Sequence, residues 1–305
     1  MQTTNHVLMV RPVRFAFNEE TATNNAFQVK SVSAEAALRI QQQAVAEFDD
    51  YVALLRGKGI TVEVLQDTAE PFTPDSIFPN NCFSTHMEDG RHTLVLYPMY
   101  APNRRRERDK LMTALGKMDF DQVIDLTSWE QKGNYLEGTG SLILDREHRM
   151  AYACLSPRTN REVVSEWAEA LGYDYFLFHS EDEQGTPVYH TNVVMHVGTR
   201  YAIVCLDSIK DADERQTLVG LLEERGKEIV DISLEQMHQF AGNMLELCSR
   251  QGEKLLVMSQ TARRSLTPRQ LLTLMQDVSI VTPHIQAIET AGGGSARCML
   301  AELYY

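Results

Sequence analysis

The residues of this sequence best suited to chemistry are a cysteine, a histidine and a glutamate that lie far apart in the chain. Cys298 follows three glycines in "AGGGSARCML", His190 opens "HTNVVMHVG", and Glu137 opens "EGTGSLILD". In one pocket these side chains would supply a nucleophile, a general acid/base and a carboxylate that positions a cationic or hydrogen-bonding group. Each also has a structural explanation: a space-filling cysteine, a hydrogen-bonded strand histidine and a solvent-facing glutamate. Their positions in the fold must decide between the catalytic and the structural explanation.

A repeated unit of helix, strand and hairpin supplies those positions. Four helical patterns end near a glycine and run directly into an apolar strand, and a fifth pattern turns without a glycine. Glycine ends helices readily because it adopts positive φ without steric cost. The helix ends recur at intervals of about 55 residues, at Gly59, Gly116, Gly172, Gly226 and Asp277.

Each helix end is followed by a strand, a polar loop and two strands joined by a tight turn. We predict such turns at 145–148, 198–200 and 250–253. The fifth copy is cut, and the amino-terminal "HVLMVRP" is the partner strand that "CMLAELYY" lacks. The sequence therefore predicts an α/β fold of five modules in a single domain, residues 1–305, which closes into a ring with both termini in one module.

One position, roughly 20 residues after each helix end, carries a polar residue in every module. In a ring, these equivalent positions converge on the axis. The prediction is one pocket lined by two amides, a carboxylate, an imidazole and a thiol, with His190 and Asn192 on one face of a strand. The five residues are Asn81, Glu137, His190, Asn243 and Cys298.

Neighbouring residues extend this predicted pocket. Asp75 and Asn80 lie in "PDSIFPNNCF", although Pro-Asp and Asn-Asn pairs are also common in turns. The glycines before Cys298, with Gly294 among them, would let the backbone approach a ligand closely and offer amide donors. The "EGTGS" stretch lacks the GxGxxG and GK[ST] patterns of nucleotide-binding loops.

Composition excludes several function classes. A formal net charge of −13 and a pI of about 5.2 disfavour nucleic acid as a partner, because phosphates repel an acidic surface. The sequence contains no apolar run of about 18 residues, the length needed to span a membrane, and its amino terminus lacks the pattern of a secretion signal. Five scattered cysteines without a CxxC pair argue against disulfides and zinc. We expect a soluble, cytoplasmic protein, and leave open whether it forms a homo-oligomer.

Segments from nearly the whole chain resemble the guanidino-group-modifying superfamily of arginine deiminases, dimethylarginine dimethylaminohydrolases, succinylarginine dihydrolase and glycine amidinotransferases. Within it, the chain resembles most the deiminase-related branch of citrulline-using hydrolases. The resemblance implies a five-bladed α/β propeller (pentein), no metal or organic cofactor, and a small amino-acid substrate. The segments are "RPVRFAFNEETATNNAFQ", "PDSIFPNNCFSTH", "LEGTGSLILD", "SPRTNREV", "HTNVVMHVG", "GNMLEL" and "GGGSARCMLAEL".

By this resemblance, Cys298 matches the family's nucleophile, His190 its general acid/base and Glu137 its catalytic glutamate. Cys298 would attack the ureido or guanidino carbon, and His190 would protonate the leaving amine and then activate water.

The resemblance also implies substrate contacts. Asp75 resembles an aspartate that binds the substrate side chain, and Arg158 in "SPRTN" resembles the arginine that grips the α-carboxylate. One arginine of the cluster at 104–106, for which we take Arg105, would be a second such residue, although the register stays open. The planar donor fork of arginine suits a carboxylate.

Three departures from the deiminase pattern predict the substrate. Deiminases usually have aspartates where this chain has Asn81 and Asn192, and the aspartate of the "EGGD" pattern is Gly140. Those carboxylates pair with a guanidinium cation, whereas an amide can both donate to and accept from a neutral ureido group. We therefore predict hydrolysis of citrulline to ornithine, ammonia and carbon dioxide. Open alternatives are an arginine deiminase, a dimethylarginine hydrolase-like enzyme, an amidinotransferase and a non-catalytic propeller that binds a partner.

Overall fold

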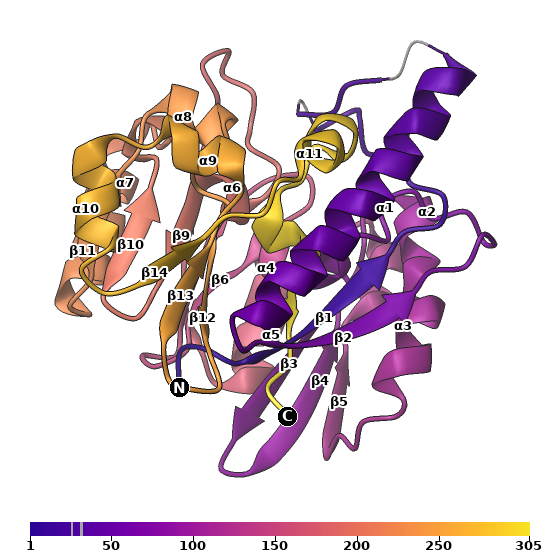
Figure 1. Cartoon of the computed structure of the whole chain (residues 1–305). Helices are drawn as coiled ribbons and strands as arrows, with labels where there is room; N and C mark the ends of the chain where they lie inside the picture. The colour runs from indigo at the N-terminus through magenta and orange to yellow at the C-terminus, as the bar shows by residue number, and fades with distance from the viewer. Residues whose placement is uncertain (26, 31–32) are drawn as a thin grey trace.

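Five three-stranded sheets surround a common axis in the computed structural model, which describes residues 1–25, 27–30 and 33–305 (Figure 1). The first sheet contains both ends of the chain and consists of β15 (Ala301–Glu302), β1 (His6–Arg11) and β2 (Thr61–Gln66). The second consists of β3 (Phe83–Glu88), β4 (Arg91–Leu96) and β5 (Gln122–Asp125), and the third of β6 (Ile143–Asp145), β7 (Met150–Cys154) and β8 (Asp174–Phe178). The fourth consists of β9 (Met195–Val197), β10 (Tyr201–Val204) and β11 (Glu228–Asp231), and the fifth of β12 (Leu245–Cys248), β13 (Lys254–Val257) and β14 (Ser279–Val281).

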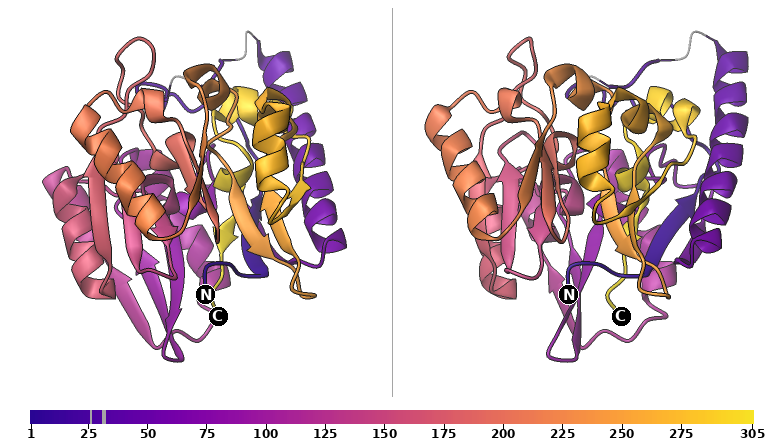
Figure 2. Two further views of the ribbon diagram at one scale, coloured as in Figure 1. Left: turned by 90° about the vertical axis from the view of Figure 1, so that its left-hand side faces the viewer. Right: turned by 60° about the vertical axis from the view of Figure 1, so that its left-hand side comes forward.

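Every sheet has the same topology. Its middle strand pairs antiparallel with one neighbour and parallel with the other, and a helical crossover joins the parallel pair. These helices lie on the outside of the ring (Figure 2). They are α1 (Ala34–Gly57), α3 (Glu107–Leu115), α5 (Arg161–Leu171), α7 (Ala212–Glu224), and the pair α9 (Gln260–Ser265) and α10 (Pro268–Leu274). The helix, strand and hairpin module is thereby confirmed.

The two termini close the ring within one sheet, as the sequence predicts. Strand β1 pairs antiparallel with β15, with Val7 opposite Glu302, and parallel with β2, with Val7 opposite Val62. The amino and carboxyl ends consequently emerge at the same end of the molecule (Figure 1). No helix among the described residues combines the length and the apolar character needed to cross a membrane.

Three of the four predicted glycine helix ends have the expected backbone. Gly59, Gly172 and Gly226 have φ of 82°, 64° and 69°. Gly116 differs, with φ of −67° after α3. There the chain continues in right-handed turns, since Lys117 N donates to Ala114 O, and the glycine is not needed for a left-handed conformation.

A single helical turn precedes the first strand of four modules. These turns are η1 (Pro79–Asn81), α4 (Gly138–Ser141), α6 (Thr191–Val194) and η4 (Ala296–Met299). The prediction that His190 and Asn192 lie on a strand is therefore wrong: His190 is the residue before α6, and β9 begins only at Met195. Tertiary contacts override the strand propensity of the Thr-Asn-Val-Val run, since Thr191 Oγ1 donates to Ser141 O at 2.5 Å.

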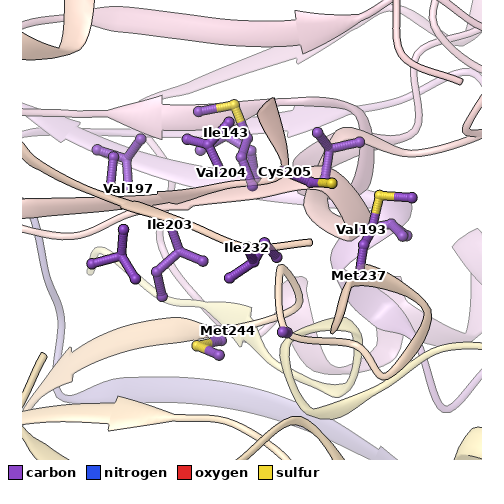
Figure 3. Close-up of a cluster of buried hydrophobic side chains, with 14 of the residues drawn as sticks. Ile143, Val193, Val197, Ile203, Val204, Cys205, Ile232, Met237 and Met244 are labelled. Carbon is purple, nitrogen blue, oxygen red and sulfur yellow. The ribbon is translucent and has the colours of Figure 1, made fainter. Parts of the chain in front are cut away.

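Apolar side chains fill the spaces between sheets and fix the ring. The largest cluster joins the third, fourth and fifth sheets, and Figure 3 shows some of its members. Because protein interiors are close-packed, this packing fixes neighbouring modules, and with them the helical turns that precede their first strands, in position relative to one another. The labelled residues are Ile143, Val193, Val197, Ile203, Val204, Cys205, Ile232, Met237 and Met244.

The remaining short helices are α2 (Pro102–Arg105), η2 (Thr127–Lys132), η3 (Leu206–Ser208), α8 (Leu234–His238) and α11 (Gln286–Gly292).

Ring closure makes Leu8 a sensitive position. Leu8 is fully buried on β1 opposite Ala301 of β15. We expect Leu8→Ala to lower the free energy of unfolding by about 2–5 kcal/mol, because the substitution leaves a cavity. Urea denaturation measures this loss. Val64→Ala on the adjacent strand β2 is the control, since Val64 is partly exposed; an equal loss in both variants would contradict the packing argument.

Candidate active site

A narrow cavity lies where the helical turns meet. Contacts join η1 to α4, α4 to α6, and η1 to η4, so residues far apart in sequence share its wall. Residues predicted from the sequence that line it are Asp75, Asn81, Arg158, His190, Gly294 and Cys298. Asn25, Phe78, Arg104, Tyr189, Gly292 and Gly293 line it as well.

Glu137 is the buried partner of the cavity histidine. Its Oε2 lies 2.7 Å from His190 Nε2 and 3.5 Å from Arg158 Nη1, and its Oε1 accepts from Tyr100 N at 2.9 Å. Burial alone would raise the pKa of Glu137, but Arg158 and His190 hold it well below its usual range. Glu137 is therefore ionised, and His190 Nε2 carries the proton that it accepts.

The histidine itself is uncharged near neutral pH. Burial lowers the pKa of His190 to about 4, although Glu137 acts in the opposite direction. With its Nε2 hydrogen directed at Glu137, Nδ1 is the basic nitrogen. The arrangement can therefore take up a proton at His190 Nδ1 while Glu137 stabilises the resulting imidazolium.

The sulfur of Cys298 lies between two side-chain amides. Asn243 Nδ2 is 3.2 Å from Sγ, and Asn192 Nδ2 is 3.5 Å from it. Arg297 N donates to Asn243 Oδ1 at 3.1 Å, which fixes the orientation of that amide with its NH₂ group toward the sulfur. Among the described residues, no carboxylate makes a hydrogen bond to this sulfur. The hydrogen-bonding partners of the sulfur are therefore amide N–H donors.

The three glycines before Cys298 allow close packing rather than forming an open loop. A Cβ on Gly292 or Gly294 would lie within 3 Å of the Phe78 ring, and Gly293 has φ of 64°. Tyr189 donates to Gly293 O at 2.9 Å. This segment therefore forms a rigid wall of the cavity.

Asp75 and Asn80 lie in different surroundings although both precede β3. Asp75 Oδ2 accepts from Asn18 at 2.7 Å and Thr21 at 3.2 Å, while its buried Oδ1 has no partner among the described residues. Burial raises the pKa of Asp75. Asn80 does not line the cavity, and its Nδ2 lies 3.5 Å from Thr139 Oγ1 behind it. Asn80 Oδ1 also has no partner among the described residues, but of these two side chains Asp75 is the one that lines the cavity and offers its free acceptor to a ligand there.

The arginine of the basic cluster that reaches the site is Arg104, not Arg105. Arg105 is half-buried outside the cavity and donates to Met99 O at 2.9 Å and Tyr100 O at 3.2 Å. Arg104 is fully buried and lines the cavity. Sequence alone could not choose between adjacent arginines, because helix α2 turns them by about 100° relative to one another.

Arg158 is held by the amino-terminal segment that covers the cavity. Its Nη2 donates to Thr21 O at 3.0 Å, and its Nε donates to Asn24 Oδ1 at 2.9 Å. The guanidinium also lies 4.8 Å from the centroid of the Tyr189 ring. The polar run "TATNN", which contains these partners, is the signal in the sequence that could have identified this cover.

Within the described parts of the chain, no group of three or more histidine, cysteine, aspartate or glutamate side chains is arranged to hold a metal ion.

Comparison with known proteins places the chain in a family. A family model described as "N,N dimethylarginine dimethylhydrolase, eukaryotic" matches residues 11–305. The chain belongs to this family. It is therefore an arginine-related amidino hydrolase with a catalytic cysteine within the guanidino-group-modifying superfamily, and the alternative of a non-catalytic propeller is set aside. No curated protein sequence matches the chain.

Solved structures establish the fold as a five-bladed pentein propeller. The N-terminal domain of ArgZ, a cyanobacterial arginine dihydrolase, is 16% identical with a TM-score of 0.75, covering 97% of each chain. Full-length ArgZ is 17% identical with a TM-score of 0.75, covering 97% of this chain and 40% of ArgZ. A dimethylarginine hydrolase (DDAH) of Pseudomonas aeruginosa, in complex with citrulline, is 13% identical with a TM-score of 0.67, covering 99% and 100%.

The amide beside the sulfur yields a direct prediction. We expect Asn243→Leu to slow alkylation of Cys298 by iodoacetamide at pH 7 about tenfold, because a lost hydrogen bond to a charged group weakens the thiolate by about 1.5–3 kcal/mol. Mass spectrometry of the modified peptide follows the rate. The variant Cys298→Ser identifies labelling at other cysteines, and an unchanged rate in Asn243→Leu would show that this amide does not support the thiolate.

Proposed function

We propose that the protein hydrolyses the ureido group of citrulline, giving ornithine, ammonia and carbon dioxide. The observation that carries this proposal is the ring of amides at the reacting sulfur: Asn192 and Asn243 donate to Cys298 Sγ, and Asn81 lines the same cavity. Amides satisfy the carbonyl and amino groups of a neutral substrate, whereas a guanidinium cation favours carboxylates. The buried carboxylate of Glu137 is already paired with His190 and Arg158.

The first step forms a covalent intermediate. His190 Nδ1 accepts the thiol proton of Cys298, and Sγ attacks the ureido carbon. The negative charge that develops on the ureido oxygen is stabilised by nearby N–H donors, including the backbone around Gly294. The imidazolium of His190, held by Glu137, then protonates the departing amine, which leaves a thiocarbamoyl group on Cys298.

The second step consumes water and regenerates the enzyme. Neutral His190 takes a proton from water, the resulting hydroxide attacks the thiocarbamoyl carbon, and the sulfur leaves as a thiolate. The carbamate that is released decomposes to an amine and carbon dioxide. Whichever nitrogen departs first, one citrulline and one water give one ornithine, one ammonia and one carbon dioxide.

Two charged groups would anchor the amino-acid end of the substrate. Asp75 has a free Oδ1 that can accept from the substrate's amino group or side-chain nitrogen. Arg158 lines the same cavity, and its Nη1 has one N–H beyond the contact with Glu137 that can donate to the α-carboxylate. Both side chains are buried, so each contact would form away from bulk water.

A second candidate substrate is N,N-dimethylarginine, which the family match favours because its model covers residues 11–305. In that reaction the attacked carbon carries a positive charge. Asp75 is the cavity carboxylate with a free oxygen, so this substrate depends on it to balance the charge. An amidinotransferase would use the same catalytic side chains but require an acceptor amine in place of water.

A substrate panel separates these candidates. We expect ornithine and ammonia from citrulline alone when the purified protein meets citrulline, arginine, methylated arginines and succinylarginine separately. Cys298→Ser is the blank and should lose activity by about 10³-fold or more while staying folded. Citrulline formed from arginine or from a methylated arginine would overturn the citrulline proposal, and a requirement for added glycine would indicate transfer.

The low pKa of His190 predicts an acid-tolerant enzyme. We expect kcat/KM for citrulline to stay level from pH 8 down to about 5 and to fall toward pH 4, because only protonated His190 fails to accept the thiol proton. Circular dichroism at each pH controls for unfolding. A fall in kcat/KM centred between pH 6 and 7 would show that His190 keeps its ordinary pKa.

A further inference from the structure

At the wall of the cavity, Arg104 forms a buried ion pair with Glu107 and contacts Asn81. Arg104 Nε and Nη2 each lie 3.0 Å from a Glu107 carboxylate oxygen, and both side chains are 2% exposed. Two further donors of Arg104 reach Asn81 Oδ1 at 2.7 Å and Phe78 O at 2.9 Å. One Nη1 hydrogen has no partner among the described residues, so the guanidinium has a single free donor for a ligand and no free fork for a substrate carboxylate.

This contact fixes the orientation of the Asn81 amide. Arginine has only donors, so the Asn81 atom that faces Arg104 must be the acceptor Oδ1. The NH₂ group then points the other way, and Nδ2 lies 3.4 Å from Glu137 O, which is an acceptor. Both neighbours therefore require the same orientation.

The NH₂ group of Asn81 lies beside the histidine that acts on the substrate. A Cβ at Gly140 would overlap Asn81 Nδ2 and would lie 2.9 Å from both His190 Nδ1 and Cε1. Only a glycine at position 140 leaves room for this approach. Asn81 and His190 also line the same cavity as Cys298.

We propose that the Arg104–Glu107 pair is a positioning device that holds Asn81 as a hydrogen-bond donor and thereby selects a substrate whose reacting carbon carries an oxygen. The inference rests on the proposed function and deepens it. A ureido oxygen accepts from Asn81 Nδ2, and its hydrogen bond strengthens as the oxygen becomes negative in the transition state. A guanidinium has no acceptor, so the Asn81 donor would face another donor and stay unpaired.

The charge of Arg104 adds to this effect. Its cationic group pulls electron density toward Asn81 Oδ1, which makes the opposite N–H a stronger donor. Although burial opposes the charge, Glu107 and Asp75 keep the pKa of Arg104 above its ordinary value. Glu107 thus allows a cation to remain behind a site that reacts with a neutral group.

The test removes both partners of the ion pair together, in Arg104→Met/Glu107→Leu, so that no uncompensated charge stays buried. We expect kcat for citrulline to fall about 100-fold, the cost of losing one oxyanion donor, with KM within about threefold because ground-state contacts persist. The ratio of citrulline to arginine kcat/KM should fall at least about tenfold; where arginine is not turned over, its Ki replaces that value.

Matched control variants distinguish a loss of Asn81 positioning from a general loss of folding or activity. Arg106→Met removes an exposed charge of the same cluster and should leave all constants unchanged. Arg104→Lys keeps the charge without the fork and should restore part of kcat. If the double variant does not fold, Asn81→Asp provides the test, since it keeps the Arg104 contact but replaces the donor by an oxygen; kcat for citrulline should fall about 100-fold or more.

The outcomes distinguish the two proposals. A wild-type enzyme that does not hydrolyse citrulline overturns the proposed function itself. A wild-type enzyme that hydrolyses citrulline, with a double variant that keeps its kcat or loses activity on both substrates by one factor, overturns only the positioning role. Full citrulline turnover by Asn81→Asp would overturn it as well.

Discussion

The buried carboxylate of Glu137 is the interaction on which the site depends. A charge in the protein interior is costly unless it is paired and hydrogen-bonded. Glu137 meets this requirement through His190, Arg158 and the backbone of Tyr100. Tyr100 and His190 belong to the modules on either side of the one that holds Glu137 and Arg158, so the charge depends on the packing of neighbouring modules. In return, Glu137 fixes the tautomer of His190 and holds Arg158 against the amino-terminal cover of the cavity.

Around that pair the electrostatics divide into two regions. Charges are balanced in two buried ion pairs, in which Arg158 faces Glu137 and Arg104 faces Glu107. At the sulfur itself the hydrogen-bonding groups are neutral amides. The ion pairs can therefore orient the side chains of the site, while the amide dipoles at the sulfur can respond to charge that develops there during a reaction. This arrangement is the physical basis on which we propose a ureido rather than a guanidino substrate.

Steric constraints make this arrangement possible. Gly140 leaves the space in which the Asn81 amide approaches the His190 ring, and the glycines before Cys298 let the Phe78 ring pack against the backbone. A side chain at these positions would push apart groups that must act together. The single helical turns before the strands have a related effect, since in four modules they direct polar side chains toward the axis rather than along a sheet.

The sequence by itself determined the period, the module, the pairing of the termini and the residue types at the axis, because helix ends, hairpin turns and polar positions are local signals that recur. It also supported the choice of Cys298, His190 and Glu137. Tertiary structure decided the rest: that His190 precedes a helical turn and not a strand, that Arg104 rather than Arg105 reaches the site, and that Asn80 lies behind it. These outcomes depend on which way a backbone turns under contacts from other modules, and a local pattern carries no information about such contacts.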